Sequence, residues 1–229
     1  MLDDNKMPLR AAIIPTICTF IIDFGFYSPT MKYCAGFHHY CMATAFDRWV
    51  PVIAWFAPVY LSFFIFWFVS FLLAAKAGKD QFYRLFEAYL LAEIVLLICF
   101  IFLPTTNAGM RPEITSDGFQ WKMLAYVYGN DQPTNLFPSG HVLISWFAFI
   151  GVRGRKEIAK GYRVFACIWA ILIIIATQVL KQHVIADAIA SLIIAEFFWW
   201  ICGSKWHGFG VKINHFFTAV NRALHIESK

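Results

Sequence analysis

The chain has 229 residues, of which 60% are apolar, 19% are aromatic and only 14% are charged. Soluble domains carry about 25% charged residues, so this composition excludes an ordinary soluble protein and indicates a membrane protein. The net charge of +5 does not indicate nucleic-acid binding, because the basic residues lie between apolar stretches rather than in one cluster. No linker, repeat or low-complexity tract divides the chain, so we expect a single membrane-embedded domain over residues 1–229.

Six apolar stretches approach the roughly 20 residues that a membrane-spanning helix requires. In chain order they cover residues 10–28, 50–75, 84–106, 138–152 with their neighbours, 163–182 and 183–204. Asp23 interrupts the first stretch and no small-residue cleavage site follows it, so we interpret it as a retained helix rather than a signal peptide. The last two stretches are joined by hardly any loop. The expected fold class is therefore all-α, a polytopic bundle of six transmembrane helices with short interfacial helices.

The distribution of lysine and arginine predicts the orientation of this bundle. The N-terminus, the 76–84 and 153–163 loops and the C-terminal tail together hold 14 of the 19 basic residues. Because positive loops stay in the cytoplasm, both termini are expected to be cytoplasmic and the 107–136 loop extracytoplasmic. Within that loop, the aromatic stretch from Phe119 to Tyr126 is typical of a segment that lies in the membrane interface.

His183 and Asp187 form the first candidate catalytic group. They are four residues apart at the start of the sixth apolar stretch, so both side chains would lie on one helix face. A carboxylate beside an imidazole can accept its N–H and stabilise the ring when it becomes cationic, which leaves the other ring nitrogen free to attack. The alternative is an interfacial histidine beside a structural aspartate. Ionisable residues inside a span are functional candidates by default.

The tetrapeptide Pro138-Ser139-Gly140-His141 forms the second candidate group. Pro favours the first turn of a helix, and Ser139 and Gly140 would then present a hydroxyl and unobstructed N–H groups to an anion at the helix N-terminus. His141 would lie close enough to donate a proton to a leaving oxygen. The alternative is an ordinary capped helix start with a histidine nearby.

Two basic residues complete the candidate site. Arg111 can contact phosphate oxygens in a bidentate manner and stays charged at any working pH. Lys181 lies two residues before His183 and could direct its ammonium group at the same phosphate. The alternatives are a headgroup contact for Arg111 and a lysine that extends to the interface for Lys181.

These segments resemble the three signature motifs of the type 2 phosphatidic acid phosphatase superfamily. That superfamily comprises metal-independent membrane lipid phosphatases and related enzymes, with vanadium haloperoxidases as soluble members. The resemblance covers, in family order, Arg111-Pro112, Phe137-Pro138-Ser139-Gly140-His141 and Lys181-Gln182-His183 with Asp187. It implies that His183 attacks phosphorus to form a phosphohistidine, supported by Asp187, and that His141 protonates the leaving group. It further implies that Arg111, Ser139 and Gly140 hold the phosphate, with no cofactor and no metal.

Two positions depart from the family pattern. The family has a lysine seven residues before the first-motif arginine and an arginine six residues before the nucleophile, where this chain has Pro104 and Thr177. Lys181, Arg84 or Lys122 could replace these cations. A site with fewer cations suits a substrate with fewer phosphate charges, such as a diester, which leaves a transferase activity open.

Other polar residues in the apolar stretches have a structural explanation available. Asp23, Glu93 and Glu196 are expected to make polar contacts between helices. The six cysteines show no zinc-site spacing. Cys34 and Cys41 share one loop and could pair in an oxidising compartment.

The function that the sequence favours is hydrolysis of a lipid phosphate ester at the extracytoplasmic face of a bacterial inner membrane. Phosphatidic acid, phosphatidylglycerophosphate, polyprenyl pyrophosphate and a lipid A phosphate are all suitable substrates. One alternative is a lipid phosphotransferase that moves a phosphoryl or phosphoalcohol group to an acceptor lipid. Another is an inactive relative that binds or transports phospholipid. The expected partners are the lipid phosphate and membrane lipids, without nucleic acid.

Overall fold

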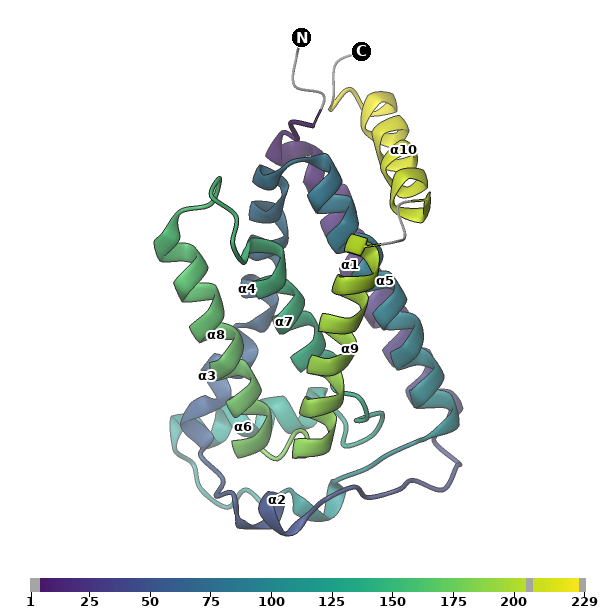
Figure 1. The fold of residues 1–229 in the computed structure, drawn as a ribbon. Coiled ribbons are helices and arrows are strands. Elements are labelled where there is room, and N and C mark those ends of the chain that lie inside the picture. The colour runs from purple at the N-terminus through teal and green to yellow at the C-terminus, as the bar shows by residue number, and fades with distance from the viewer. Residues whose placement is uncertain (1–4, 205–207, 227–229) are drawn as a thin grey trace.

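The chain folds as a helical bundle in a computed structural model, which describes residues 5–204 and 208–226. Figure 1 shows its long helices packed side by side along one direction. They are α1 (Leu9–Tyr33), α4 (Phe63–Ala74), α5 (Lys79–Phe102), α7 (Gly140–Val152), α8 (Lys160–Val179) and α9 (Ile185–Ser204). The described residues contain no strand, only two isolated bridges, Tyr40 with Thr105 and Thr106 with Thr134. The predicted fold class, a polytopic helical membrane protein, is confirmed.

Five helical segments are long and apolar enough to cross a membrane. One of them, Ala54–Ala77, is built from the 3-10 turn η1 (Ala54–Phe56), α3 (Ala57–Leu61), α4 and a second 3-10 turn, η2 (Ala75–Ala77). The segment predicted as the fourth span is the apolar helix α7, which has only 13 residues. At about 1.5 Å per residue it covers about 20 Å, less than the roughly 30 Å hydrocarbon core.

Large aromatic side chains fill the space between these helices. Trp67, Phe71, Tyr89 and Phe147 are almost completely buried, and the Trp67, Phe71 and Phe147 rings all contact Tyr89 within 6.1 Å between centroids. Helix α7 packs tightly against α5 and α4 at Gly151. A Cβ atom at this position would lie 2.6 Å from Leu85 Cδ2 and 3.2 Å from Ala74 Cβ. A larger residue here would therefore require its neighbours to move.

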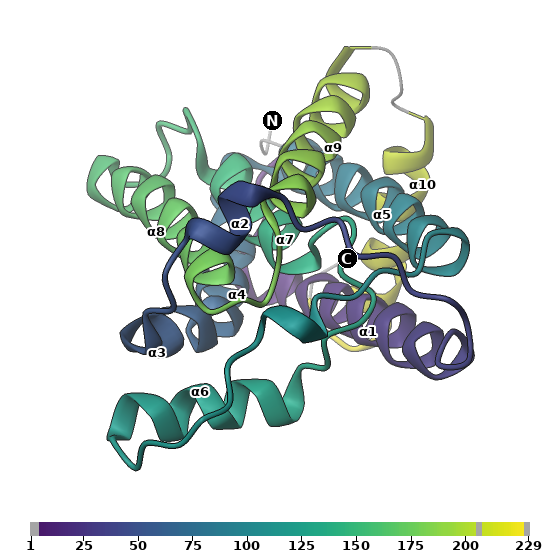
Figure 2. The same cartoon turned by 90° about the horizontal axis from the view of Figure 1, so that it is seen from below.

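Short helices cover the two ends of the bundle. The start of α1 and the amphipathic helix α10 (Gly208–Ala223) lie at one end, and α2 (Ala45–Trp49) and α6 (Phe119–Asn130) lie at the other (Figures 1 and 2). The 3-10 turn η3 (Ala108–Met110) precedes α6 in the chain. Helix α6 buries Leu124 and Val127 while Phe119 and Tyr126 remain exposed, as expected for a helix that lies along an interface.

Two charged residues named from the sequence, Arg84 and Glu196, have contacts away from the α2–α6 end. Arg84 lies over the Trp199 ring and donates to the Trp199 carbonyl at 2.6 Å, near the end of α9. Glu196 forms an ion pair of 2.6 and 2.9 Å with Arg153. Arg84 as a replacement phosphate ligand is therefore wrong. Cys34 and Cys41 are both free thiols, Cys34 buried and Cys41 exposed.

The tight contact at Gly151 predicts a large effect of a side chain there. Gly151→Leu should lower the thermal midpoint of the detergent-solubilised protein strongly, because overpacking a filled core costs about 1–3 kcal/mol or more. Gly161→Leu on α8 is the matched control, because no atom lies within 4 Å of a Cβ at Gly161. Equal midpoints for the two variants would contradict the close α5–α7 packing.

Candidate functional site

The site is organised by the turn that joins α8 to α9. The chain reverses over residues 180–184, and the N–H groups of Gln182 and His183 both donate to the Thr177 carbonyl, at 2.9 and 3.1 Å. Lys181 adopts a positive φ of 55° within this reversal. The carbonyl of Thr177, the residue in place of the family arginine, therefore closes the turn that presents His183.

Four residues from other parts of the chain hold the same turn. The Asp47 carboxylate in α2 accepts from the Ile185 N–H at 2.7 Å, and the Lys181 ammonium group donates to the Asp47 carbonyl at 2.5 Å. Asn107 donates to the Lys181 carbonyl at 2.7 Å, and the Tyr128 hydroxyl donates to the Leu180 carbonyl at 2.8 Å. Arg111, the fourth, reaches the Gln182 side chain. The position of His183 thus depends on α2, η3 and α6 together.

His183 lies in this turn rather than on α9, which begins at Ile185. Its Nδ1 atom still lies 3.2 Å from Asp187 Oδ2, because the aspartate is in the first turn of the helix and also accepts from the Val184 N–H at 3.0 Å. The same Nδ1 atom lies 3.1 Å from the Leu136 carbonyl. A carbonyl oxygen can only accept, so Nδ1 carries the proton and Nε2 keeps its lone pair. His183 is only 6% exposed, yet it lines a cavity.

The second motif begins helix α7 at the wall of this cavity. Ser139 is the N-cap, and its buried hydroxyl accepts from the Val142 N–H at 3.3 Å. Its carbonyl accepts from the Ser191 hydroxyl at 2.8 Å, which ties α7 to α9. Gly140 lines the cavity. The N–H groups of Gly140 and His141 belong to the first turn, where a helix supplies no acceptors. The Ser139 hydroxyl therefore caps α7.

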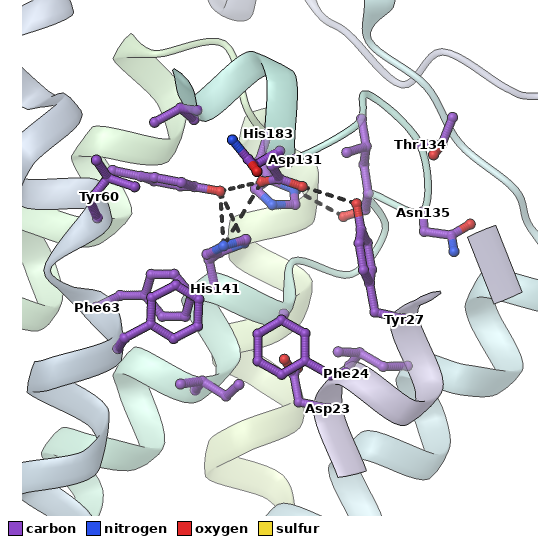
Figure 3. A pocket seen from close by; sticks show the side chains of 18 of the residues that line it. Asp23, Phe24, Tyr27, Tyr60, Phe63, Asp131, Thr134, Asn135, His141 and His183 are labelled. Carbon is purple, nitrogen blue, oxygen red and sulfur yellow. Dashed lines mark hydrogen bonds and ion pairs between the residues drawn. The ribbon is translucent and has the colours of Figure 1, made fainter. Parts of the chain in front are cut away.

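His141 faces His183 across the cavity, with 5.8 Å between the ring centroids. Its Nε2 atom lies 2.8 Å from the Tyr60 hydroxyl, and that hydroxyl hydrogen-bonds to Asp131 Oδ2 (Figure 3). Tyr60 donates its single proton to the carboxylate, so its oxygen accepts from His141. Asp131 Oδ2 is also 3.9 Å from His141 Nε2. A tyrosine and an aspartate therefore hold the orientation of His141.

Asp131 is a site residue that the sequence did not reveal. Burial acts to raise the pKa of its carboxyl group, but His141 and the Tyr60 and Tyr27 hydroxyl groups outweigh burial and bring that pKa below its ordinary value. Tyr27 reaches it from α1, donating to Oδ1 at 3.0 Å. In the sequence, Asp131 is simply an acidic residue in the loop before Pro138. Nothing in its neighbourhood along the chain distinguishes it from Asp117, which is exposed.

Arg111 lies behind the cavity wall. Its guanidinium donates to the Asp131 carbonyl at 2.8 Å and to Gln182 Oε1 at 2.5 Å, and it stacks over the Tyr128 ring at 4.7 Å. Burial lowers the pKa of Arg111 from its ordinary value, although the charge of Asp131 acts in the opposite direction. The Arg111 guanidinium thus connects the Asp131 loop to the turn that carries His183.

The structure does not bring Lys181 or Lys122 into the cavity. The Lys181 ammonium group donates to the carbonyls of Asp47 and Val50, both at 2.5 Å, and the residue is 5% exposed. Burial lowers its pKa, and the Asp47 charge acts against that. Lys122 is exposed on α6. In this geometry Lys181 holds the turn, whereas the sequence suggested that it contacts the phosphate.

The cavity between the helices has a volume of about 600 Å³. His141, His183, Gly140 and Asp131 form part of its wall, and seven of the other lining residues are phenylalanine or tyrosine. Side chains that line it come from α1, α3, α4, α5, α6 and α7. Among the residues that the structure describes, no three His, Cys, Asp or Glu side chains are grouped to hold a metal ion.

Fold and site together define a polytopic helical membrane protein with two histidines facing one cavity. Residues 84–208, more than half of the chain, match the PAP2 superfamily, and the protein belongs to that superfamily. Its members generally hydrolyse phosphate esters, so membership supports an activity of the phosphatase or phosphotransferase type. No curated protein and no solved structure matches the sequence.

The contacts of Lys181 predict that its substitution disturbs the turn rather than phosphate binding. Lys181→Met leaves two buried carbonyl groups without a donor, at a cost of about 1–3 kcal/mol, so the thermal midpoint and kcat should both fall. KM should change little. Lys122→Met is the control and should alter none of these quantities. A large rise in KM at unchanged thermal stability would instead indicate a direct phosphate contact.

The hydrogen bonds of Asp131 predict that it positions His141. Asp131→Asn should lower kcat by about 10²-fold, the lower range for loss of general acid–base catalysis, because the oriented negative charge beside His141 is lost. KM should stay nearly constant. Asp117→Asn in the same loop is the matched control. Equal steady-state kinetics for the two variants would remove Asp131 from the site.

Proposed function

We propose that this protein hydrolyses a lipid phosphate ester through a phosphohistidine on His183. The observation that carries this proposal is the arrangement of the His183 ring. Nδ1 is held by Leu136 and Asp187, so Nε2 is the nitrogen with a free lone pair. Attack by Nε2 on phosphorus would make the ring cationic, and the Asp187 carboxylate would stabilise that charge.

His141 supplies the proton that the leaving alcohol needs. Its ring lies 5.8 Å from that of His183 between centroids, so one phosphoryl group can contact both rings. The charge of the neighbouring Asp131 favours the protonated form of His141, against the effect of burial. After the alcohol leaves, the neutral His141 takes a proton from water, and the water attacks the phosphohistidine to release inorganic phosphate.

The start of α7 and the Arg111 guanidinium provide positive potential for the phosphate. The first-turn N–H groups of Gly140 and His141 carry the positive end of the helix dipole. Arg111 adds a full charge behind Asp131 and Gln182. These groups replace part of what the family cations supply at the positions of Pro104 and Thr177 here.

The apolar walls of the cavity support a lipid rather than a soluble substrate. Phe24 on α1 and Phe64 on α4 both line the cavity, stack on each other at 5.9 Å, and are 46% and 37% exposed. An acyl chain could enter between α1 and α4 at this pair. Because α7 is shorter than the hydrocarbon core, we expect His141 at its start to lie below the membrane surface, within reach of an ester bond. Charge asymmetry favours an extracytoplasmic site with both termini in the cytoplasm.

The phosphohistidine mechanism predicts the behaviour of a His183→Ala variant. Phosphate release from phosphatidic acid in detergent micelles should fall by at least about 10⁴-fold, as for removal of other enzyme nucleophiles. The wild-type activity should persist in excess chelator. Acid-sensitive, alkali-stable ³²P should be trapped on the wild-type protein from a labelled substrate. His38→Ala, an exposed histidine, is the control and should keep full activity.

The same experiment separates hydrolysis from transfer. Release of inorganic phosphate without an added acceptor supports a phosphatase. Labelling of His183 without phosphate release, followed by transfer when an acceptor lipid is added, would identify a phosphotransferase. Full activity of His183→Ala would contradict both mechanisms.

A further inference from the structure

The end of the cavity away from Asp131 contains two acidic side chains that the proposed mechanism does not use. Asp23 on α1 and Glu93 on α5 both line the cavity. Figure 3 shows Asp23 at the base of the pocket, across from Asp131. A Cβ atom on Gly140 would lie 3.8 Å from Asp23 Oδ1, so this carboxyl group is next to the start of α7. Acids within spans are costly, and they usually serve a function.

Glu93 has an unused hydrogen-bonding atom in this part of the cavity. The residue is 2% exposed, and within the described part of the chain its Oε1 atom is buried without a hydrogen-bond partner. Tyr89 is a hydrogen-bonding neighbour of the same carboxyl group. Glu196, another acid within a span, instead has both oxygens bonded to Arg153. A buried acceptor without a donor, on a residue that lines a cavity, is explained by a ligand that brings the donor.

The rest of the cavity wall matches a cationic ligand. Three carboxyl groups line the cavity, and no lysine or arginine among the described residues does so. Seven further lining residues are phenylalanine or tyrosine, including Phe24, Phe63 and Tyr27. Aromatic faces and carboxylates are the groups that bind ammonium ions.

We infer that the substrate is a lipid phosphate ester whose organic part carries a primary ammonium group, bound by Glu93 and Asp23. This inference rests on the proposed function and specifies its substrate class. The phosphate lies between His183 and His141, and the ammonium group lies at the Asp23–Glu93 end of the same cavity. A primary ammonium group has three N–H donors, and one of them can bond to the unpartnered Glu93 Oε1. A quaternary ammonium group has no such donor. The positive charge on the substrate also compensates for the missing family cations.

The test compares two substrates that differ only in this group, 2-aminohexadecyl phosphate and 2-hydroxyhexadecyl phosphate, in mixed micelles. Wild-type protein should show a KM about tenfold lower for the amino compound, as expected for one charged hydrogen bond. Glu93→Gln and Asp23→Asn should raise that KM about tenfold and remove the preference, with little change in kcat. Glu196→Gln is the matched control and should retain the preference.

Two results would overturn the inference. They are equal KM values for the two substrates with the wild-type protein, and variants that raise both KM values equally. A binding measurement with the corresponding phosphonates, which cannot be hydrolysed, separates this inference from the proposed function. Thermal stabilisation by the amino phosphonate that depends on Glu93, without phosphate release from either ester, would support the ammonium site and contradict the phosphatase activity. Stabilisation by both phosphonates alike would contradict the ammonium site.

Discussion

The hydrogen bond from the His183 N–H to the Thr177 carbonyl is the contact on which the rest of the site depends. It closes the reversal between α8 and α9, so that His183 points inward without a loop. A turn this short has little internal structure, and the protein therefore braces it from outside. Asp47 holds both sides of the turn, and Asn107 and Tyr128 bond to its carbonyl groups. These contacts explain why α2 and the connection over residues 103–118 pack against the α2–α6 end of the bundle.

The parts of the site that the sequence predicted are those set by local spacing. His183 and Asp187 are four residues apart and meet even though the helix begins after the histidine, because Asp187 caps the first turn. The Pro138–His141 segment begins a helix, as its proline predicted. Six apolar stretches correspond to helices for the same reason, since span length and composition are local properties. The short α7 is the one helix that falls below the expected span length.

Long-range packing determined what the sequence could not predict. Asp131 and Tyr60 are 71 residues apart. Nothing in the sequence near either residue indicates that they form a hydrogen bond beside His141. Lys181 looks like a phosphate ligand from its distance to His183 along the chain, but its positive φ and the carbonyls of α2 direct it elsewhere. Arg84 is the first residue of the range that matches the family. It nevertheless contacts Trp199 near the end of α9, far from His183. The positive charge of Lys181 and Arg84 therefore could not show whether either residue binds the phosphate.

The shortness of α7 also affects how the rate of reaction would scale. In the proposed function, His141 at the start of α7 lies below the membrane surface. A reactive group there meets a lipid by lateral diffusion within the bilayer, not by collision from water. The relevant substrate concentration is then the mole fraction of that lipid in the membrane. Diluting the vesicles would leave turnover unchanged, whereas diluting the substrate with an inert lipid at constant bulk concentration would reduce it.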